Sequence, residues 1–413
     1  MKRMAENPFK THFGKQIQKL FRRKPALGSL PESTLSLSAL PPLEVILKRI
    51  ENIPKDSLRF FLPSPLEDEG LLLGREEEMN RLEKALKNWE EGHPASVALV
   101  GPQGAGKTSL VNCFLGRHPG DWRILRGSLE TRIIGEDLVL AFFNRLFLLD
   151  PPAADIRTLI DRVLDGEPRI VVVESAHNIL LRILGGRRAA ELFLYVVLAT
   201  RPRHFWLLTC RQLPWNSMDR IFQISRFFSH LVPVKPLPED TLQDALSLRI
   251  EGSGLKPFFF DSEEESLRDP KPGEDRNGEK RQAFFKRVFS NTGRNLYAAL
   301  YFMLLGCRHE ADSLSILFWP PERLDVGFLK EMDHLTLLSL AEMAGHGALT
   351  VSEHEGIFRT DGVRSRTVFE YLEQAGLIVP DPFGGDGHER SFEISPVIHD
   401  HVTAVLEQLN LLY

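Results

Sequence analysis

Between residues 71 and 236, short apolar runs alternate with longer stretches in which apolar side chains recur every three or four positions. The apolar runs predict strands near 96–101, 122–129, 169–174, 204–211 and 231–234. The periodic stretches predict amphipathic helices near 75–89, 107–115, 136–149, 155–164 and 189–200. The run at 169–173 is continuous and β-branched, which is typical of a strand buried on both faces of a parallel sheet. The pattern therefore predicts an α/β fold, a parallel sheet flanked by helices.

Charge and proline content separate this α/β domain, 67–236, from what precedes it. Residues 1–24 form a basic tail in which Phe9, Phe13 and Ile17 fall at helical spacing among lysines and arginines. Residues 25–66 are rich in proline, serine and leucine, and predict a linker with one short helix.

Two further regions follow the α/β domain. Residues 237–321 predict a helical lid, and within it 261–281 are so dense in charged residues, proline and glycine that we expect a disordered insertion. Residues 322–413 predict a separate compact domain. Its predicted elements are helices at 334–344, 350–357 and 362–375, strands at 377–379 and 391–394, and a closing helix at 396–409.

Three helices followed by a hairpin are the pattern of a winged helix, a relative of the helix-turn-helix. Arginines at or before the third helix and in the hairpin are candidates for phosphate contacts with duplex DNA: Arg359, Arg364, Arg366 and Arg390. Acidic residues in the same region weaken that basic character, among them Glu370, Glu373 and Glu389. Contact with a protein partner therefore stays open as an alternative.

The strand predicted at 96–101 runs into a glycine-rich loop and then a helix. The loop has the spacing G-x-x-x-x-G-K-[ST] and consists of Gly101, Pro102, Gln103, Gly104, Ala105, Gly106, Lys107, Thr108 and, at the start of the helix, Ser109. Glycines allow backbone N–H groups to turn toward phosphates without a Cβ in the way. Lys107 supplies a mobile positive charge, and the Thr108 hydroxyl is a ligand for Mg²⁺. The loop therefore predicts a nucleoside triphosphate site with Mg²⁺ as its metal.

The buried strand at 169–174 ends in a single acid, Glu174, followed by Ser175. Ligands of open α/β sheets lie at the carboxyl ends of the strands, where a carboxylate reaches the metal on the phosphates. Two assignments of Glu174 stay open. In the first, Glu174 is the acid on the side of the metal, and the acid that polarises the attacking water is missing. In the second, Glu174 is the acid that polarises the water, and Val173 stands in the place of the metal-side acid. We prefer the first, and both predict slow hydrolysis.

Composition restricts the kind of partner and the cellular compartment that we expect for this protein. The 413 residues carry a formal net charge of -5, so there is no global basic field for nucleic acid. Three scattered cysteines fit a reduced protein and not a disulfide framework. The basic start has no apolar stretch of a secretory signal and no run is long enough to span a membrane, so we expect a cytoplasmic protein.

These motifs resemble P-loop ATPases of the AAA+/STAND group with a C-terminal winged helix, and the layout over residues 70–413 is similar to that of archaeal origin-recognition initiators. The resemblance implies ATP as the nucleotide, with GTP still open. It also implies four roles for arginines. Arg75 lies in the lead-in beside the adenine, and Arg211 approaches the γ-phosphate. Arg226 is the first candidate for the finger that serves a neighbouring subunit, with Arg220 second, and Arg294 reaches back from the lid.

The resemblance implies a nucleotide-driven switch that acts on a protein partner and assembles as a homo-oligomer when nucleotide binds. A DNA-binding ATPase that uses the winged helix is the second hypothesis. The third is an ATPase docked on a membrane surface through residues 1–24 alone.

Overall fold

A five-stranded parallel sheet forms the centre of the α/β domain in the computed structural model, which describes residues 34–120, 122–268, 277–309, 314–381 and 389–412. The strand order is β3-β4-β5-β2-β6. The strands are β2 (Ser96–Gly101), β3 (Arg123–Ser128), β4 (Arg169–Glu174), β5 (Phe205–Arg211) and β6 (His230–Pro233). The register pairs Gly101 with Arg211 and Ser128 with Glu174, so the residues that end neighbouring strands lie at one edge of the sheet. The parallel α/β sheet predicted from the sequence is confirmed.

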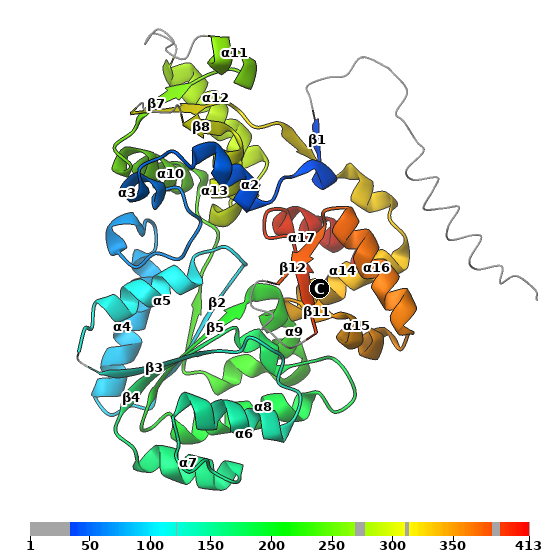
Figure 1. The fold of residues 1–413 in the computed structure, drawn as a ribbon. Helices are drawn as coiled ribbons and strands as arrows, with labels where there is room; N and C mark the ends of the chain where they lie inside the picture. Colours follow the sequence, from blue (N-terminus) through cyan, green and yellow to red (C-terminus); the bar gives the residue numbers. More distant parts are fainter. Residues whose placement is uncertain (1–33, 121, 269–276, 310–313, 382–388, 413) are drawn as a thin grey trace, which may run out of the picture. The chain divides into compact units, whose positions relative to one another are not determined.

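Helices cover both faces of this sheet, as Figure 1 shows. Alternate strand residues such as Leu99 and Val172 pack with helices α4 (Glu76–Glu90) and α5 (Lys107–Gly116). The intervening residues, such as Val100 and Val173, pack on the opposite side. That side is covered by α6 (Glu136–Leu146), α7 (Ile156–Asp165), α8 (Arg187–Thr200) and α9 (Gln212–Phe222). The alternation follows from the two-residue period of a strand.

The region after β6 is not purely helical, in contrast to the prediction. It contains α10 (Glu239–Gly252), α11 (Glu263–Arg268), α12 (Asn277–Ser290) and α13 (Leu296–Leu305). It also contains a three-stranded sheet in the order β7-β9-β8, made of β7 (Lys256–Phe259), β9 (Ser315–Phe318) and β8 (Cys307–His309). Phe259 and Phe318 stack in this sheet with ring centroids 5.3 Å apart, which gives the short strands an apolar face to bury.

Two stretches of the chain are more ordered than we expected. The predicted disordered insertion, 261–281, includes α11 and the beginning of α12, where Lys280 forms ion pairs with Asp261 and Glu265. Residues 269–276 lie outside the described residues.

The predicted linker before the α/β domain contributes buried side chains to the lid core, including Ile46, Ile50 and Phe61. It forms α2 (Leu43–Leu47) and α3 (Lys55–Leu58), and the Tyr301 hydroxyl donates to the Pro41 carbonyl at 2.6 Å. The spaced apolar side chains of this stretch find partners on α13, which a local sequence window does not contain.

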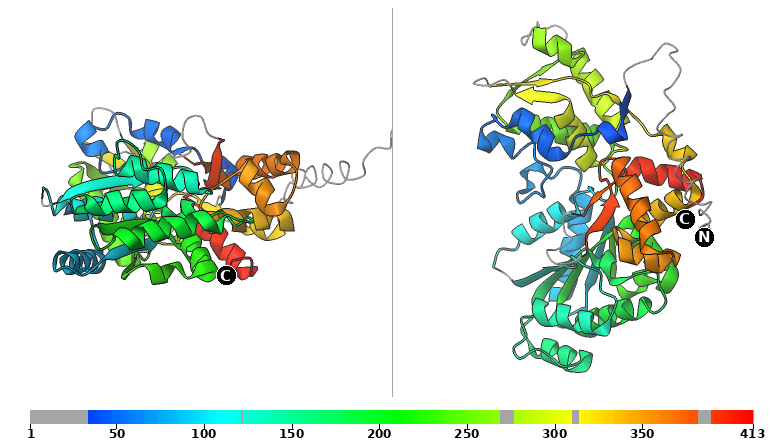
Figure 2. Two further views of the ribbon diagram at one scale, coloured as in Figure 1. Left: turned by 90° about the horizontal axis from the view of Figure 1, so that it is seen from below. Right: turned by 45° about the vertical axis from the view of Figure 1, so that its right-hand side comes forward.

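The C-terminal region has the elements that the sequence predicted, which are α14 (His334–His346), α15 (Val351–Phe358), α16 (Gly362–Gln374), β12 (Ile378–Pro380), β13 (Ser391–Ile394) and α17 (His399–Gln408). It also contains a short strand that the sequence did not predict, β11 (Leu349–Thr350). The strands form an antiparallel sheet in the order β11-β13-β12. Figure 2 shows this sheet from two further directions. Among the described residues, no helix combines the length and apolar character needed to cross a membrane.

Candidate functional site

The glycine-rich loop joins the end of β2 to the start of α5, as the spacing predicted. Gly104 and Gly106 have φ values of +73° and +86°, which L-amino acids with side chains rarely adopt. A Cβ at Gly104 would lie 2.5 Å from the Oδ1 of Asn295 and 2.7 Å from the Cβ of Tyr297, so this position has no room for a side chain. The loop thus combines left-handed backbone with close packing against the lid.

Lys107 points back into the loop. Its Nζ donates to the carbonyl oxygens of Gly101 and Pro102, at 2.9 and 2.7 Å. Burial, together with the nearby charges of Arg211 and Arg75, lowers the pKa of Lys107 from 10.5 to about 7. Bringing an anion to this amine would stabilise its charged form, so the loop is suited to a phosphate.

Glu174 lies on the same side of the sheet as the loop helix. Its Oε2 accepts a hydrogen bond from the Thr108 hydroxyl at 2.9 Å, and its Oε1 accepts one from the Arg126 Nε at 2.7 Å. Val173 is buried on the opposite face. A hydroxyl and a carboxylate in contact are the oxygen ligands that Mg²⁺ favours, so the residues present fit this metal.

A pocket extends from the loop toward the lid. Its phosphate end is formed by residues 104–109 and Arg75, and its other end is largely apolar, with Leu237, Ala245, Leu296 and Leu300. Arg75 is 5% exposed and donates to the carbonyls of Ala105 and Lys235, at 3.0 and 2.8 Å. A polar loop beside an apolar slot suits a molecule with a polyphosphate and a flat base.

Arg211 leaves the end of β5 and meets the C-terminal region. Its Nη2 lies 2.6 Å from the Oε2 of Glu393, and its Nη1 donates to the Gly347 carbonyl at 2.8 Å. The other carboxylate oxygen of Glu393 accepts from the Gln103 side chain at 3.0 Å. The Glu393 side chain is only 3% exposed. A buried carboxylate from β13 therefore contacts both the glycine-rich loop and Arg211.

Two predicted arginines lie outside this arrangement. Arg294 has a φ of +71°, is exposed and is not among the residues that line the pocket, so its contact with the nucleotide stays a prediction. Asn295 caps α13 and donates to the Gln103 carbonyl at 2.6 Å. Arg226 is exposed on a short 3₁₀ turn, Ile224–Phe227, next to the edge strand β6. An exposed position is compatible with action on a neighbouring subunit, and that role stays a prediction.

The sequence reasoning missed Arg126, Asn295, Glu393 and also Arg249, which extends from α10 and lines the pocket. Arg126 is the only one with a readable signal, because it lies in the strand predicted at 122–129. In β3 it is two residues before Ser128, the register partner of Glu174, and so shares a face with Glu174. The other three come from the lid and from β13, and nothing local in their sequence places them at the loop.

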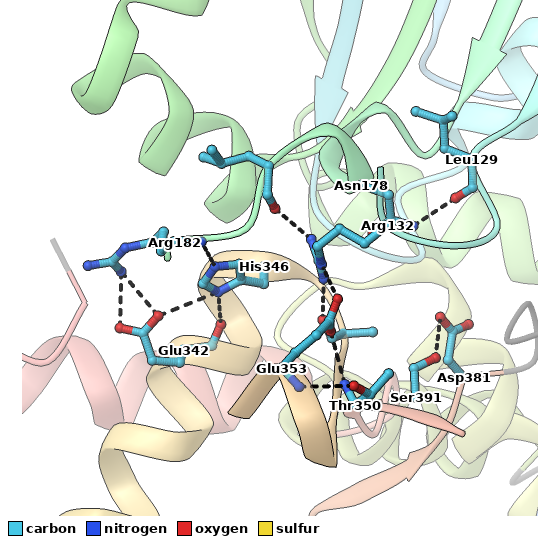
Figure 3. A network of polar contacts seen from close by, with 12 residues as sticks. Leu129, Arg132, Asn178, Arg182, Glu342, His346, Thr350, Glu353, Asp381 and Ser391 are labelled. Carbon is cyan, nitrogen blue, oxygen red and sulfur yellow. Dashed lines mark hydrogen bonds and ion pairs between the residues drawn. The ribbon is translucent and has the colours of Figure 1, made fainter. Parts of the chain in front are cut away.

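Additional ion pairs join the α/β domain to the C-terminal region (Figure 3). Arg132, whose side chain is 6% exposed, lies 2.7 Å from Glu353 and also donates to the carbonyls of Leu180 and Ala348. Arg182 lies 3.1 Å from Glu342, and its backbone N–H donates to the Nε2 of His346. In these pairs, as in that of Arg211 with Glu393, the arginine comes from the α/β domain and the glutamate from the C-terminal region.

The parallel sheet and the glycine-rich loop together have the P-loop NTPase fold of the α/β class. Residues 71–215 match the family model of the AAA ATPase domain, which confirms the resemblance to AAA+ ATPases for this region. No curated protein sequence matches the chain significantly.

Solved structures with similar folds include the Aeropyrum pernix ORC2 protein in its ADPNP–ADP complexes, at 13% identity and a TM-score of 0.43, covering 85% of this chain and 97% of that one. Cdc6p from Pyrobaculum aerophilum has 14% identity and a TM-score of 0.43, with 85% and 98% covered. The Thermotoga maritima RuvB branch migration motor has 15% identity and a TM-score of 0.33, with 83% and 98% covered. Similarity at this level assigns no role to a residue.

Proposed function

We propose that this protein is a cytoplasmic, ATP-binding and slowly hydrolysing switch of the AAA+/STAND type. Lys107 and the amides of the loop hold the phosphates, and Thr108 and Glu174 hold Mg²⁺, which shields phosphate charge and orients the attacking water. The match of residues 71–215 to the AAA ATPase domain supports ATP as the nucleotide. The single acid at the end of β4, Glu174, supports slow hydrolysis. Arg226 would serve a second copy of the chain in a nucleotide-dependent oligomer.

The observation that carries the switch is the position of Glu393. Its carboxylate bonds to the loop through Gln103 and to Arg211, the residue proposed to report the γ-phosphate. A γ-phosphate near these groups brings at least one more negative charge toward a buried carboxylate. Like charges at close range repel strongly where water is excluded. ATP would therefore compete with Glu393 for Arg211 and loosen the C-terminal region, whereas ADP would leave this contact in place.

Hydrogen exchange on the full chain tests the switch. We expect ATP with Mg²⁺ to increase amide exchange in β13, and ADP to leave it unchanged. Glu393→Gln removes the charge but keeps the shape, so it should bind ATP more tightly and show fast β13 exchange with either nucleotide. Glu342→Gln is the matched control, because it weakens another ion pair of the same interface without touching the loop. The switch is refuted if ATP binds and β13 exchange does not respond.

Lys107→Ala tests the nucleotide site itself. The variant loses the positive charge inside the loop, and we expect no measurable ATP binding by calorimetry. Unchanged ATP affinity would remove the basis for the whole proposal.

Duplex DNA is the second candidate partner. We propose that residues 334–408 are a winged helix with α16 as its recognition helix, because the helices and the β11-β13-β12 sheet follow that order. Arg359, Arg364 and Arg366 are exposed at or just before the start of α16. Binding of labelled duplex by the full chain should then weaken steeply with salt and be lost on exchanging Arg364 and Arg366 for glutamate. Absence of binding at low salt would leave a protein partner as the target.

The third hypothesis, docking on a membrane, depends on residues 1–24, which lie outside the described residues. It stays a prediction, to be tested by vesicle binding with and without this tail.

A further inference from the structure

Residues 57–67, which we call the strap, join the lid to the loop helix α5. At the lid end, the Ser57 hydroxyl donates to the Ser253 carbonyl at 2.6 Å, and Phe61 is fully buried in the lid core. At the other end, the Leu66 N–H donates to the Ser109 hydroxyl at 3.0 Å, and Asn112 donates to the Leu66 carbonyl at 2.9 Å. Figure 1 shows this segment in light blue between α3 and α5.

The middle of the strap is part of the nucleotide pocket. Pro63, Ser64 and Pro65 line the same cavity as Lys107 and Thr108. The apolar slot formed by Ala245, Leu296 and Leu300 lines this cavity too. A base that enters the slot therefore lies within reach of the strap, although no part of the strap belongs to the glycine-rich loop.

Arg249 holds the strap at this point. It extends from α10, one turn after Ala245, and lines the pocket. Its Nη1 donates to the carbonyls of Phe60 and Leu62, at 3.0 and 3.5 Å. Arg249 is only 3% exposed. One guanidinium therefore joins the lid helix to the backbone immediately before Pro63.

The charge of Arg249 is costly in the free protein. Burial lowers the pKa of Arg249, and no carboxylate among the described residues offsets that effect. A buried charge with only carbonyl partners is less stable than one paired with an anion. The phosphates of a nucleotide would supply negative charge within the same pocket.

We propose that Arg249 is a positioning residue for nucleotide binding. It holds the strap in the position in which the strap lines the pocket and recognises the base of the nucleotide. This inference rests on the proposed function. Pro63 and Pro65 have no N–H, so the backbone of this wall presents mainly hydrogen-bond acceptors. At C6, adenine carries an amino donor and guanine a carbonyl oxygen. A strap whose acceptors are held facing this position therefore favours ATP over GTP.

The test compares Arg249→Met with the wild-type full chain, using fluorescent ATP and GTP analogues and steady-state hydrolysis. We expect the Kd for ATP to rise about tenfold, because the strap must then be ordered by the ligand itself. The preference for ATP over GTP should fall toward one, because the strap no longer holds its acceptors in place for either base. Arg249→Lys, which keeps a charged donor, should recover most of the affinity.

Arg203→Met is the matched control. Arg203 also donates to a backbone carbonyl, that of Gly166 at 2.7 Å, but it lies before β5, at the end of the sheet opposite to the loop. Nucleotide affinity should not change in this variant. If Arg249→Met does not fold, Ser57→Ala loosens the same strap at a partly buried hydrogen bond and should shift the ATP-to-GTP ratio in the same direction.

Two results would overturn the inference. One is a folded Arg249→Met variant that binds both nucleotides as the wild type does. The other is an equal loss for ATP and GTP that follows a loss of thermal stability, which would indicate a merely structural role. Wild-type protein that binds no ATP would instead refute the proposed function.

Discussion

Lys107 makes nucleotide affinity dependent on pH between about 7 and 9. Its pKa is about 7 in the free protein, because the amine is buried and faces the charges of Arg211 and Arg75. A bound polyphosphate neutralises those charges and raises the pKa of Lys107. Between these two pKa values the complex holds one proton more than the free protein, so affinity must fall as pH rises above 7.

The size of the effect follows from the same pKa. At pH 8, one unit above it, about nine of ten molecules carry a neutral Lys107, which corresponds to about a tenfold loss of affinity relative to the fully charged form. Nucleotide affinity continues to fall by up to about tenfold per pH unit until the pH reaches the pKa of Lys107 in the complex. The phosphates of the nucleotide are fully ionised above pH 7.5, so they contribute little in this range.

Titration calorimetry of ADP between pH 7 and 9, in buffers with different ionisation enthalpies, measures both affinity and proton uptake. We expect uptake of close to one proton per nucleotide at pH 8. Lys107→Arg keeps a charge that does not titrate, so whatever affinity it retains should be independent of pH. Constant affinity and no proton uptake in the wild type would refute the reasoning.

Three further outcomes are expected. Gly104→Ala should abolish tight nucleotide binding and lower thermal stability, because the new Cβ requires a strained backbone and collides with Asn295. Arg132→Met should lower the free energy of unfolding, measured in urea, by about 3 kcal/mol, because Glu353 loses its ion-pair partner. Arg187→Met removes an exposed ion pair and should change that free energy by less than about 0.5 kcal/mol. Burial lowers the pKa of His346 from 6.5 to about 3. Since the unfolded chain then binds more protons, stability to urea should fall as pH drops from 6.5 toward 3, by up to about 1.4 kcal/mol per pH unit, and less steeply in His346→Gln.

The parts of the fold that depend on local pattern were predictable. The strands at β2, β4 and β5 are continuous apolar runs, and the helices of the C-terminal region have readable caps, such as Thr350 with Glu353 at the start of α15. The glycine-rich loop and Glu174 were likewise found from the sequence, since parallel strands bring their carboxyl ends together.

What was missed depends on contacts between distant segments. Phe61 and Ile46 find their core partners in a lid that begins only at residue 237, so the local pattern indicated only a linker. The three-stranded sheet of the lid consists of strands of three or four residues, too short to give a periodic signal. Glu393 looked like an ordinary hairpin residue, and only the packing of β13 against the loop gives it a role.

The chain crosses between the lid and the α/β domain twice, once before α4 and once after β6, and the two crossings touch. A Cβ at Gly74 would lie 2.7 Å from Thr241 and 3.2 Å from Leu237, so the outgoing and returning segments pass side by side. Two neighbouring attachments form a hinge, which permits rotation of the lid about the line that joins them and opposes rotation about other axes. Because both crossings lie at this hinge, the path of the chain restricts movement of the lid to rotation about that one axis.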